Sequence, residues 1–262
     1  MSGTVRVARE GAIARVTLAR PEVRNAFNAE LIADLHDAFV SLATNPPDAL
    51  RAVVLAGEGP AFCAGADVTW MRASVALSVE DNEADARRMA EMLEAIDACP
   101  APVVARVHGA ALGGGMGLCA VADVTLAAAD TVFGFTETKL GILPAVISPF
   151  VIARIGEGPA RALFPTGERF GAERAMRIGL VHEMLADEAH LDARVVEVLG
   201  ELLSAGPHAA RAAKAIIRDQ RGLSAADTRS LTVSAIARQR VSPEGQEGLT
   251  AYLDKRPPSW RD

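Results

Sequence analysis

Three apolar runs constrain the fold more than any other feature of this sequence. They cover residues 51–57 (RAVVLAG), 102–109 (PVVARVHG) and 123–128, and segments 83–98 and 114–121, which separate them, are predicted helices. Apolar runs that are rich in β-branched residues and do not alternate with polar ones are typical of strands buried on both faces. Because such strands alternate with helices, the sequence predicts an α/β core with mostly parallel strands.

The character of the sequence changes along the chain. Segments 5–8 and 12–18 predict a hairpin at its start, and Asn28 is expected to cap a helix that reaches Ala43. After Pro149 one short strand near 180–184 is predicted, and all other segments look helical: 149–155, 157–164, 171–178, 188–204, 207–220, 224–240 and 243–254. We therefore expect an α/β core over residues 1–200 and a helical region over residues 201–262.

Composition narrows the class of partner. The net charge is −6 and the pI is about 5.5, so the chain lacks the basic footprint of a nucleic-acid binder and nucleic acid is not an expected partner. The three cysteines are an odd number without zinc-type spacing, which favours reduced thiols and no metal. No apolar run is long enough for a membrane span, and the start of the chain does not look like a signal sequence. We expect a cytoplasmic protein that acts on a small molecule.

The stretch HGAALGGGMGL, residues 108–118, carries five glycines beside a predicted helix, where glycine is unfavourable. Residues 115–120 match G-x-G-x-x-A, but they lie about seven residues beyond the strand, and that strand is not the first, so a dinucleotide site is disfavoured. Close helix packing would explain one or two glycines. The third interpretation is an oxyanion hole, in which unpaired N–H groups at the helix start meet a substrate oxygen. One donor would come from Gly114 and the second from the loop FCAGAD, residues 62–67.

Four pieces of the sequence together resemble the crotonase superfamily of enoyl-CoA hydratases and isomerases: AFCAGAD, VHGAALGGGMGL, Asp123 and FGFTETKLGILPA. The resemblance runs from RPEVRNAFN at 20–28 to KRPPSW at 255–260. Through TETKLGILPAVISP and KRPP, the chain is most similar to bacterial hydratases of the methylglutaconyl-CoA type.

This resemblance implies a spiral core of ββα units followed by a helical trimerisation region, in a homotrimer or a dimer of trimers. The implied substrate is an acyl-CoA thioester, and no cofactor is implied beyond the coenzyme A of that substrate. The oxyanion hole would consist of the N–H groups of Ala66 and Gly114. Contacts to coenzyme A would fall on Arg24, Ala26, Ala64, Asp67, Val68, Thr69 and Lys255.

The resemblance also locates the acid/base chemistry. A typical hydratase of this family divides its two proton transfers between two glutamates, one three residues after the oxyanion-hole glycine and one about 20 residues later. Glu137 matches the second position, where burial near an acyl pocket should raise its pKa toward neutrality. The first position is Gly117, which has no side chain.

Several alternatives follow from this missing carboxylate. Glu137 performs both proton transfers of a hydratase, or Asp130, Glu157 or His108 replaces the missing group. An enoyl-CoA Δ3-Δ2 isomerase would need Glu137 alone, and a catalytically silent or RNA-binding family member is a further alternative. The acyl pocket is expected to depend on residues 70–72, Met92 and the segment 142–150.

Overall fold

The computed structural model describes residues 3–261 and contains a six-stranded sheet in the order β1-β2-β3-β4-β6-β9. Its strands are β1 (Val5–Glu10), β2 (Ile13–Leu18), β3 (Ala52–Gly57), β4 (Val103–Val107), β6 (Val124–Ala128) and β9 (Glu183–Leu185). Only the β1–β2 hairpin pairs antiparallel in this sheet, and every later pair is parallel. The predicted hairpin and the parallel core are therefore confirmed.

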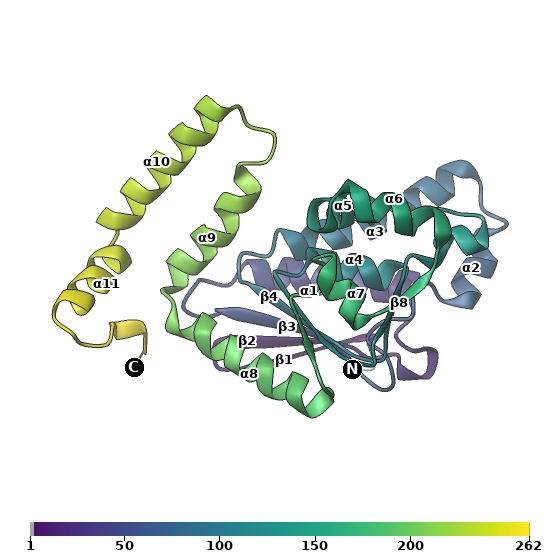
Figure 1. Ribbon diagram of the computed structural model, residues 1–262, viewed down its shortest axis with the longest axis horizontal. Helices are drawn as coiled ribbons and strands as arrows, with labels where there is room; N and C mark the ends of the chain where they lie inside the picture. Colours follow the sequence, from purple (N-terminus) through teal and green to yellow (C-terminus); the bar gives the residue numbers. More distant parts are fainter. Residues whose placement is uncertain (1–2, 262) are drawn as a thin grey trace.

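Helices cover both faces of this sheet (Figure 1). On one face, Val53 and Val103 pack with residues of α1 (Ala29–Ala43), α3 (Val79–Asp97) and α4 (Gly114–Val121). On the other face, Val54 and Val104 pack against α8 (Glu188–Ser204). Neighbouring valines of one strand thus point to opposite faces, and both faces are covered by helices, which is why these runs are apolar without alternation.

Capping side chains set where the first helices begin. The Asn28 side chain accepts a hydrogen bond from the Leu31 N–H at 2.8 Å, so the predicted cap of α1 is confirmed. The predicted helix 83–98 is longer than expected at its start, because the Ser78 side chain accepts the Asp81 N–H and α3 begins at Val79. Residues 79–82 (VEDN) contain one apolar side chain followed by three polar ones and carry no apolar periodicity, so this first turn was not predicted.

A second, three-stranded sheet was not predicted. It has the order β5-β7-β8 and consists of β5 (Ala110–Leu112), β7 (Val132–Gly134) and β8 (Arg169–Gly171). Strands of three residues are too short to produce a periodic pattern. Helix α7 (Ala172–Arg177) packs against β7 and β8 of this sheet. The other helices between residues 68 and 166 that have not yet been named are α2 (Val68–Ser74), the 3-10 helix η2 (Thr136–Leu140), α5 (Ser148–Ile155) and α6 (Glu157–Thr166).

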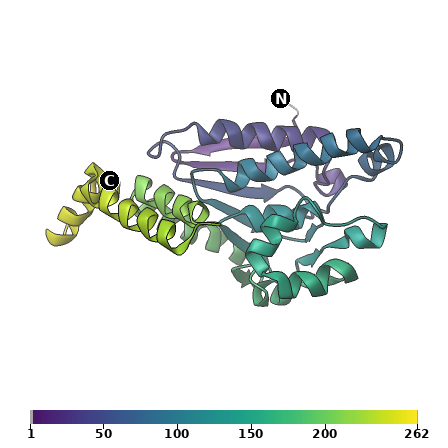
Figure 2. The same ribbon diagram turned by 90° about the horizontal axis from the view of Figure 1, so that it is seen from above.

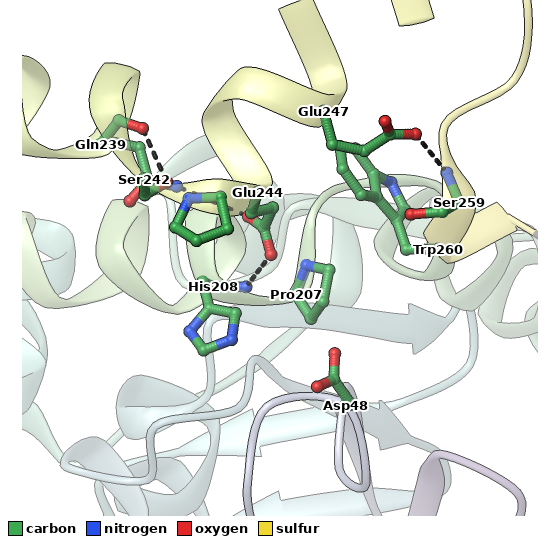
Figure 3. A pocket seen from close by; sticks show the side chains of 10 residues that line it. Asp48, Pro207, His208, Gln239, Ser242, Glu244, Glu247, Ser259 and Trp260 are labelled. Carbon is green, nitrogen blue, oxygen red and sulfur yellow. Dashed lines mark hydrogen bonds between the residues drawn. The ribbon is translucent and has the colours of Figure 1, made fainter.

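The C-terminal helices α9 (Pro207–Asp219), α10 (Ala225–Val241) and α11 (Pro243–Leu253) extend away from the sheet and its covering helices (Figures 1 and 2). The Glu244 carboxylate of α11 connects this helix to the start of α9 by accepting the N–H groups of His208 and Ala209 at 2.8 and 2.7 Å. Glu247 accepts the Ser259 N–H in the same region, and these side chains line an open hollow of about 710 Å³ (Figure 3). Within residues 3–261 no helix is long and apolar enough to cross a membrane.

Candidate active site

The loop 62–67 is held by backbone hydrogen bonds on two sides. On one side, the Ala64 N–H donates to Arg24 O at 3.0 Å and the Phe27 N–H donates to Gly65 O at 2.7 Å. On the other side, Cys63 forms a parallel bridge with Ala111 of β5. The loop therefore lies between the segment 24–27 and the strand that leads into the glycine stretch.

This pairing determines where the Ala66 N–H points. In a trans peptide the C=O of one residue and the N–H of the next point in opposite directions. Because the Gly65 C=O points at Phe27, the Ala66 N–H points away from Phe27, toward the side occupied by β5. Gly65, with φ of 96°, lies there against the Leu112–Gly113 backbone, since a Cβ atom on Gly65 would be 3.3 Å from Leu112 O.

At the start of α4, backbone hydrogen bonds also fix the direction of an N–H group. The Gly113 N–H donates to Gly134 O and the Gly113 C=O accepts the Met116 N–H, both at 2.9 Å. The C=O thus points along the helix, so the Gly114 N–H points out of its amino end, where no helical partner exists. A side chain is excluded at Gly114, because its Cβ would lie 2.7 Å from Met89 Cε and 2.8 Å from the Phe27 ring.

Glu137 lies in η2, against this backbone turn. Its Oε1 is 3.4 Å from the point where a Cβ atom on Gly113 would lie, and Gly113 has a positive φ of 50°. Its Oε2 is buried without a hydrogen-bond partner among the described residues. Burial raises the pKa of the Glu137 carboxyl above its ordinary value, while a hydrogen bond from its own backbone N–H has a smaller, opposing effect on that pKa. Glu137 and the Ala66 and Gly114 N–H groups therefore converge around Gly113.

The position of the missing carboxylate is filled by another part of the chain. A Cβ atom on Gly117 would lie 2.5 Å from Ile147 Cγ2 and 3.4 Å from Leu93 Cδ2, and the Ile147 side chain is buried. Gly117 therefore serves the packing of α5 against α4, which was the interpretation that explained one or two glycines. No side chain could extend from position 117 unless Ile147 moved.

Of the three residues considered as replacements, His108 makes its hydrogen bonds elsewhere, and Asp130 and Glu157 are exposed. Both ring nitrogens of His108 have hydrogen-bond partners. Nδ1 lies 2.9 Å from Arg106 Nη1, and Nε2 lies 2.8 Å from Gly59 O. Asp130 is exposed in the turn between β6 and β7, and Glu157 is exposed in the first turn of α6. Glu137 is the carboxyl group that lies against Gly113, at the start of α4.

The segments implied to contact coenzyme A are joined by Arg20, a residue that the sequence analysis did not single out. Its guanidinium donates to Ala26 O and, at 2.8 Å, to Asp67 Oδ2. Asp67 caps α2 by accepting the Thr69 N–H at 2.7 Å, and the hydrogen bond from Arg20 is the main cause that lowers the Asp67 pKa. Arg20 stands in the quoted segment RPEVRNAFN, but its partner 47 residues away could not be identified from spacing.

The other residues implied to contact coenzyme A fall in two places. Ala64 and Val68 lie in the loop and at the start of α2, and the Val68 side chain is exposed. Lys255 comes two residues after α11, and α11 lies at the opposite end of the molecule from α2 (Figure 1). Within one chain Lys255 is therefore not brought together with the other residues.

The described residues contain no group of three or more His, Cys, Asp or Glu side chains that could hold a metal ion. Cys63, Cys99 and Cys119 are buried free thiols. Burial raises the pKa of Cys63 to about 12, which disfavours the reactive thiolate form of this loop residue.

Known proteins are similar to this chain in both sequence and fold. The family model described as "Enoyl-CoA hydratase/isomerase" matches residues 8–262. A crotonyl-CoA hydratase of Syntrophomonas wolfei is 31% identical over 95% of this chain and 94% of its own length. AtuE of Pseudomonas aeruginosa has a TM-score of 0.95 at 37% identity, covering 99% of this chain and 100% of its own. An enoyl-CoA hydratase of Shewanella pealeana has a TM-score of 0.92 at 34% identity, with 98% and 96% covered. The predicted α/β crotonase fold with C-terminal helices is thus confirmed.

Proposed function

Because the chain belongs to the enoyl-CoA hydratase/isomerase family, we propose that it is an enoyl-CoA hydratase that uses Glu137 as its single acid/base group. The observation that carries this proposal is the buried, unpartnered Oε2 of Glu137 beside the glycine start of α4. A carboxyl oxygen without a protein partner is free to hydrogen-bond a water molecule, and its raised pKa suits proton exchange closer to neutral pH.

In the proposed reaction the thioester oxygen accepts hydrogen bonds from the N–H groups of Ala66 and Gly114. Glu137 as carboxylate takes a proton from water while the water oxygen forms a bond to Cβ, and electrons move to the thioester oxygen as an enolate. The same carboxyl then gives that proton to Cα, and the thioester carbonyl re-forms. The two N–H groups stabilise the negative charge where it develops, which is the largest contribution to catalysis in sites of this kind.

The test is turnover of 2-enoyl-CoA thioesters of several lengths, followed by loss of the conjugated-thioester absorbance. We expect Glu137→Gln to abolish turnover while acyl-CoA binding stays nearly intact. Glu157→Gln is the matched control, because Glu157 is an exposed glutamate outside the site, and it should keep the wild-type rate. Wild-type turnover in Glu137→Gln would contradict the proposal.

Product stereochemistry tests the single-group mechanism. One carboxyl can serve both proton transfers only from one face of the double bond, so hydration in D₂O should place the hydroxyl and the deuterium on the same face. Addition to opposite faces would require a second acid and would contradict the role of Glu137 as the only one.

An enoyl-CoA Δ3-Δ2 isomerase is the second candidate, and the contact between Gly117 and Ile147 favours it. This contact leaves an apolar wall where a second carboxylate would otherwise extend, and moving a double bond needs one base that carries one proton. With a 3-enoyl-CoA substrate, Glu137 would remove a proton from Cα and return it to Cγ. A gain of conjugated-thioester absorbance from 3-enoyl-CoA, without loss from 2-enoyl-CoA, would identify the isomerase.

Within the family, we propose the methylglutaconyl-CoA hydratase type, supported by the sequence TETKLGILPAVISP, which contains both Glu137 and Ile147. The comparison of 3-methylglutaconyl-CoA with crotonyl-CoA as substrates tests this assignment. A higher kcat/KM for crotonyl-CoA would count against it.

We also propose a cytoplasmic homotrimer or dimer of trimers, with residues 1–200 as the core and 201–262 as the assembly region. Residue 200 lies inside α8, and the helices that follow α8 carry large exposed apolar side chains: Ile217, Val233, Ile236, Val241, Leu249, Tyr252 and Leu253. A monomer would leave this apolar surface in water, which is unfavourable. Elution of the purified protein as a stable monomer would contradict the proposal.

A further inference from the structure

Arg154, in the last turn of α5, carries a half-buried positive charge that the proposed mechanism does not use. None of the ion pairs within residues 3–261 involves it. Its hydrogen bonds go instead to backbone carbonyls at the end of α4: Nε and Nη2 donate to Ala120 O at 3.3 and 3.1 Å, and Nη2 also donates to Ala122 O. Taking a guanidinium out of water without a carboxylate partner is unfavourable, so these carbonyls must compensate for it.

The carboxyl end of α4 needs such donors because all eight residues of this helix are buried. The last four C=O groups of a helix have no helical partner, and water cannot reach them here. The Thr125 hydroxyl donates to Cys119 O at 2.8 Å, and the Arg154 guanidinium donates to Ala120 O and Ala122 O. Both caps come from outside the helix, so the position of its carboxyl end depends on α5 and β6.

The other titratable groups around this end leave the guanidinium as its main positive charge. His182 accepts the Thr125 N–H through Nδ1 at 2.9 Å, and its Nε2 lies 3.0 Å from Arg154 Nη1. Burial and the Arg154 charge lower the His182 pKa, which favours the uncharged ring. Asp123 is the carboxylate with the largest electrostatic effect on the Arg154 pKa, and it forms an ion pair with Lys214 at 2.7 Å.

We propose that Arg154 is a positioning residue for the oxyanion hole, which caps the carboxyl end of α4 and adds positive charge behind the helix whose amino end holds the thioester oxygen. This inference rests on the proposed function. The negative pole of the helix lies at the end that Arg154 contacts, and the positive pole lies at Gly114. Fixing the helix and offsetting its negative pole both favour an enolate at the amino end.

The size of the effect follows from the length of the helix. Eight residues span about 12 Å, and a unit charge at that distance in a medium of effective dielectric constant near 20 changes the energy of an oxyanion enough for a roughly tenfold change in rate. The charge acts on the enolate more than on the neutral substrate. We therefore expect kcat to fall and KM to stay within about a factor of three.

The experiment compares Arg154→Gln, which keeps a hydrogen-bond donor without charge, with Arg154→Lys, which keeps the charge without the fork. Arg211→Gln is the matched control. Arg211 also donates to three backbone carbonyls, those of Asn45, Pro46 and Leu50, and none of these residues belongs to α4. The direct readout is the red shift of 4-aminocinnamoyl-CoA on binding, because polarisation of its thioester carbonyl moves its absorption to longer wavelength. The second readout is kcat on the best 2-enoyl-CoA substrate.

We expect Arg154→Gln to reduce the red shift and to lower kcat about tenfold. Arg154→Lys should recover part of both, because it keeps the charge but loses the forked contact to the two carbonyls. Arg211→Gln should change stability alone. A full red shift with wild-type kcat in Arg154→Gln would overturn the inference, as would an equal loss in Arg211→Gln. If Arg154→Gln does not fold, Arg154→Lys decides, since its single contact should leave a measurably smaller shift and an unchanged shift would refute the role. Absence of any red shift in the wild-type protein would instead refute the oxyanion hole and with it the proposed function.

Discussion

The contact between Gly117 and Ile147 predicts that one substitution has opposite effects in two backgrounds. Alanine at a buried helical position is favoured over glycine by about 1 kcal/mol in helix propensity. In the wild-type chain, however, the new Cβ would lie 2.5 Å from Ile147 Cγ2. Overpacking of this kind costs about 1–3 kcal/mol, so Gly117→Ala should destabilise the protein by about 1 kcal/mol.

Ile147→Ala removes the Cγ2 atom and should itself cost about 2–5 kcal/mol through lost burial and the cavity it leaves. The remaining Cβ of residue 147 would lie 3.2 Å from the new Cβ, which a shift of a few tenths of an ångström relieves. In this background the helix propensity dominates, and Gly117→Ala should stabilise the protein by about 0.5–1 kcal/mol. The two changes therefore have a coupling energy of about 2 kcal/mol.

The assay is urea unfolding of the four proteins at one protein concentration, since association would shift apparent stability. If Gly117→Ala stabilises both backgrounds equally, the coupling energy is zero. Ile147 would then not lie against Gly117, and the explanation of the missing carboxylate by the packing of α5 would be refuted.

Other substitutions test the remaining parts of the site. Since burial raises the folded-state pKa of Glu137, its contribution to stability is fully present below the unfolded pKa and is lost as pH rises through the raised value. Glu137→Gln should thus unfold at a higher temperature than wild type at pH 7 and lose this advantage near pH 4. The wild-type kcat/KM should fall on the acid side with a midpoint above 4.5, and a midpoint at or below that value would contradict the raised pKa. Arg20→Met should cost about 3 kcal/mol, because it leaves the buried Asp67 carboxylate without its ion-pair partner, and should raise KM for acyl-CoA more than it lowers kcat. Gly114→Val should lower kcat at least 100-fold by displacing Phe27 and the helix start, and a variant with normal kcat would show that this end of α4 is not the oxyanion hole.

The long elements of the fold could be predicted because each buries enough apolar surface to leave a pattern. Strands β3, β4 and β6 are mostly apolar runs, and the predicted helices 114–121 and 188–204 agree with α4 and α8. The three short strands of the second sheet were missed, since their position depends on backbone pairing with distant segments and three residues carry no periodicity. The loop 62–67 was predicted to supply an N–H donor, but the peptide orientation that frees the Ala66 N–H depends on its pairing with Phe27.

The helix α5 shows why part of the site could not be predicted from local sequence. Its preceding residue, Ile147, packs against Gly117 in the first half of α4, and Arg154 in its last turn bonds the carbonyls at the other end. Seven helical residues rise about 10 Å, so α5 contacts α4 both in its middle, at Gly117, and at its carboxyl end. The contact that excludes a second carboxylate and the contact that we propose to strengthen the oxyanion hole thus belong to the same packing. A change that moves α5 away from Gly117 to admit a carboxylate should also loosen the Arg154 cap. The gain of an acid at position 117 would then come with a weaker oxyanion hole, and Glu137 alone beside a well-fixed helix is the arrangement that this packing favours.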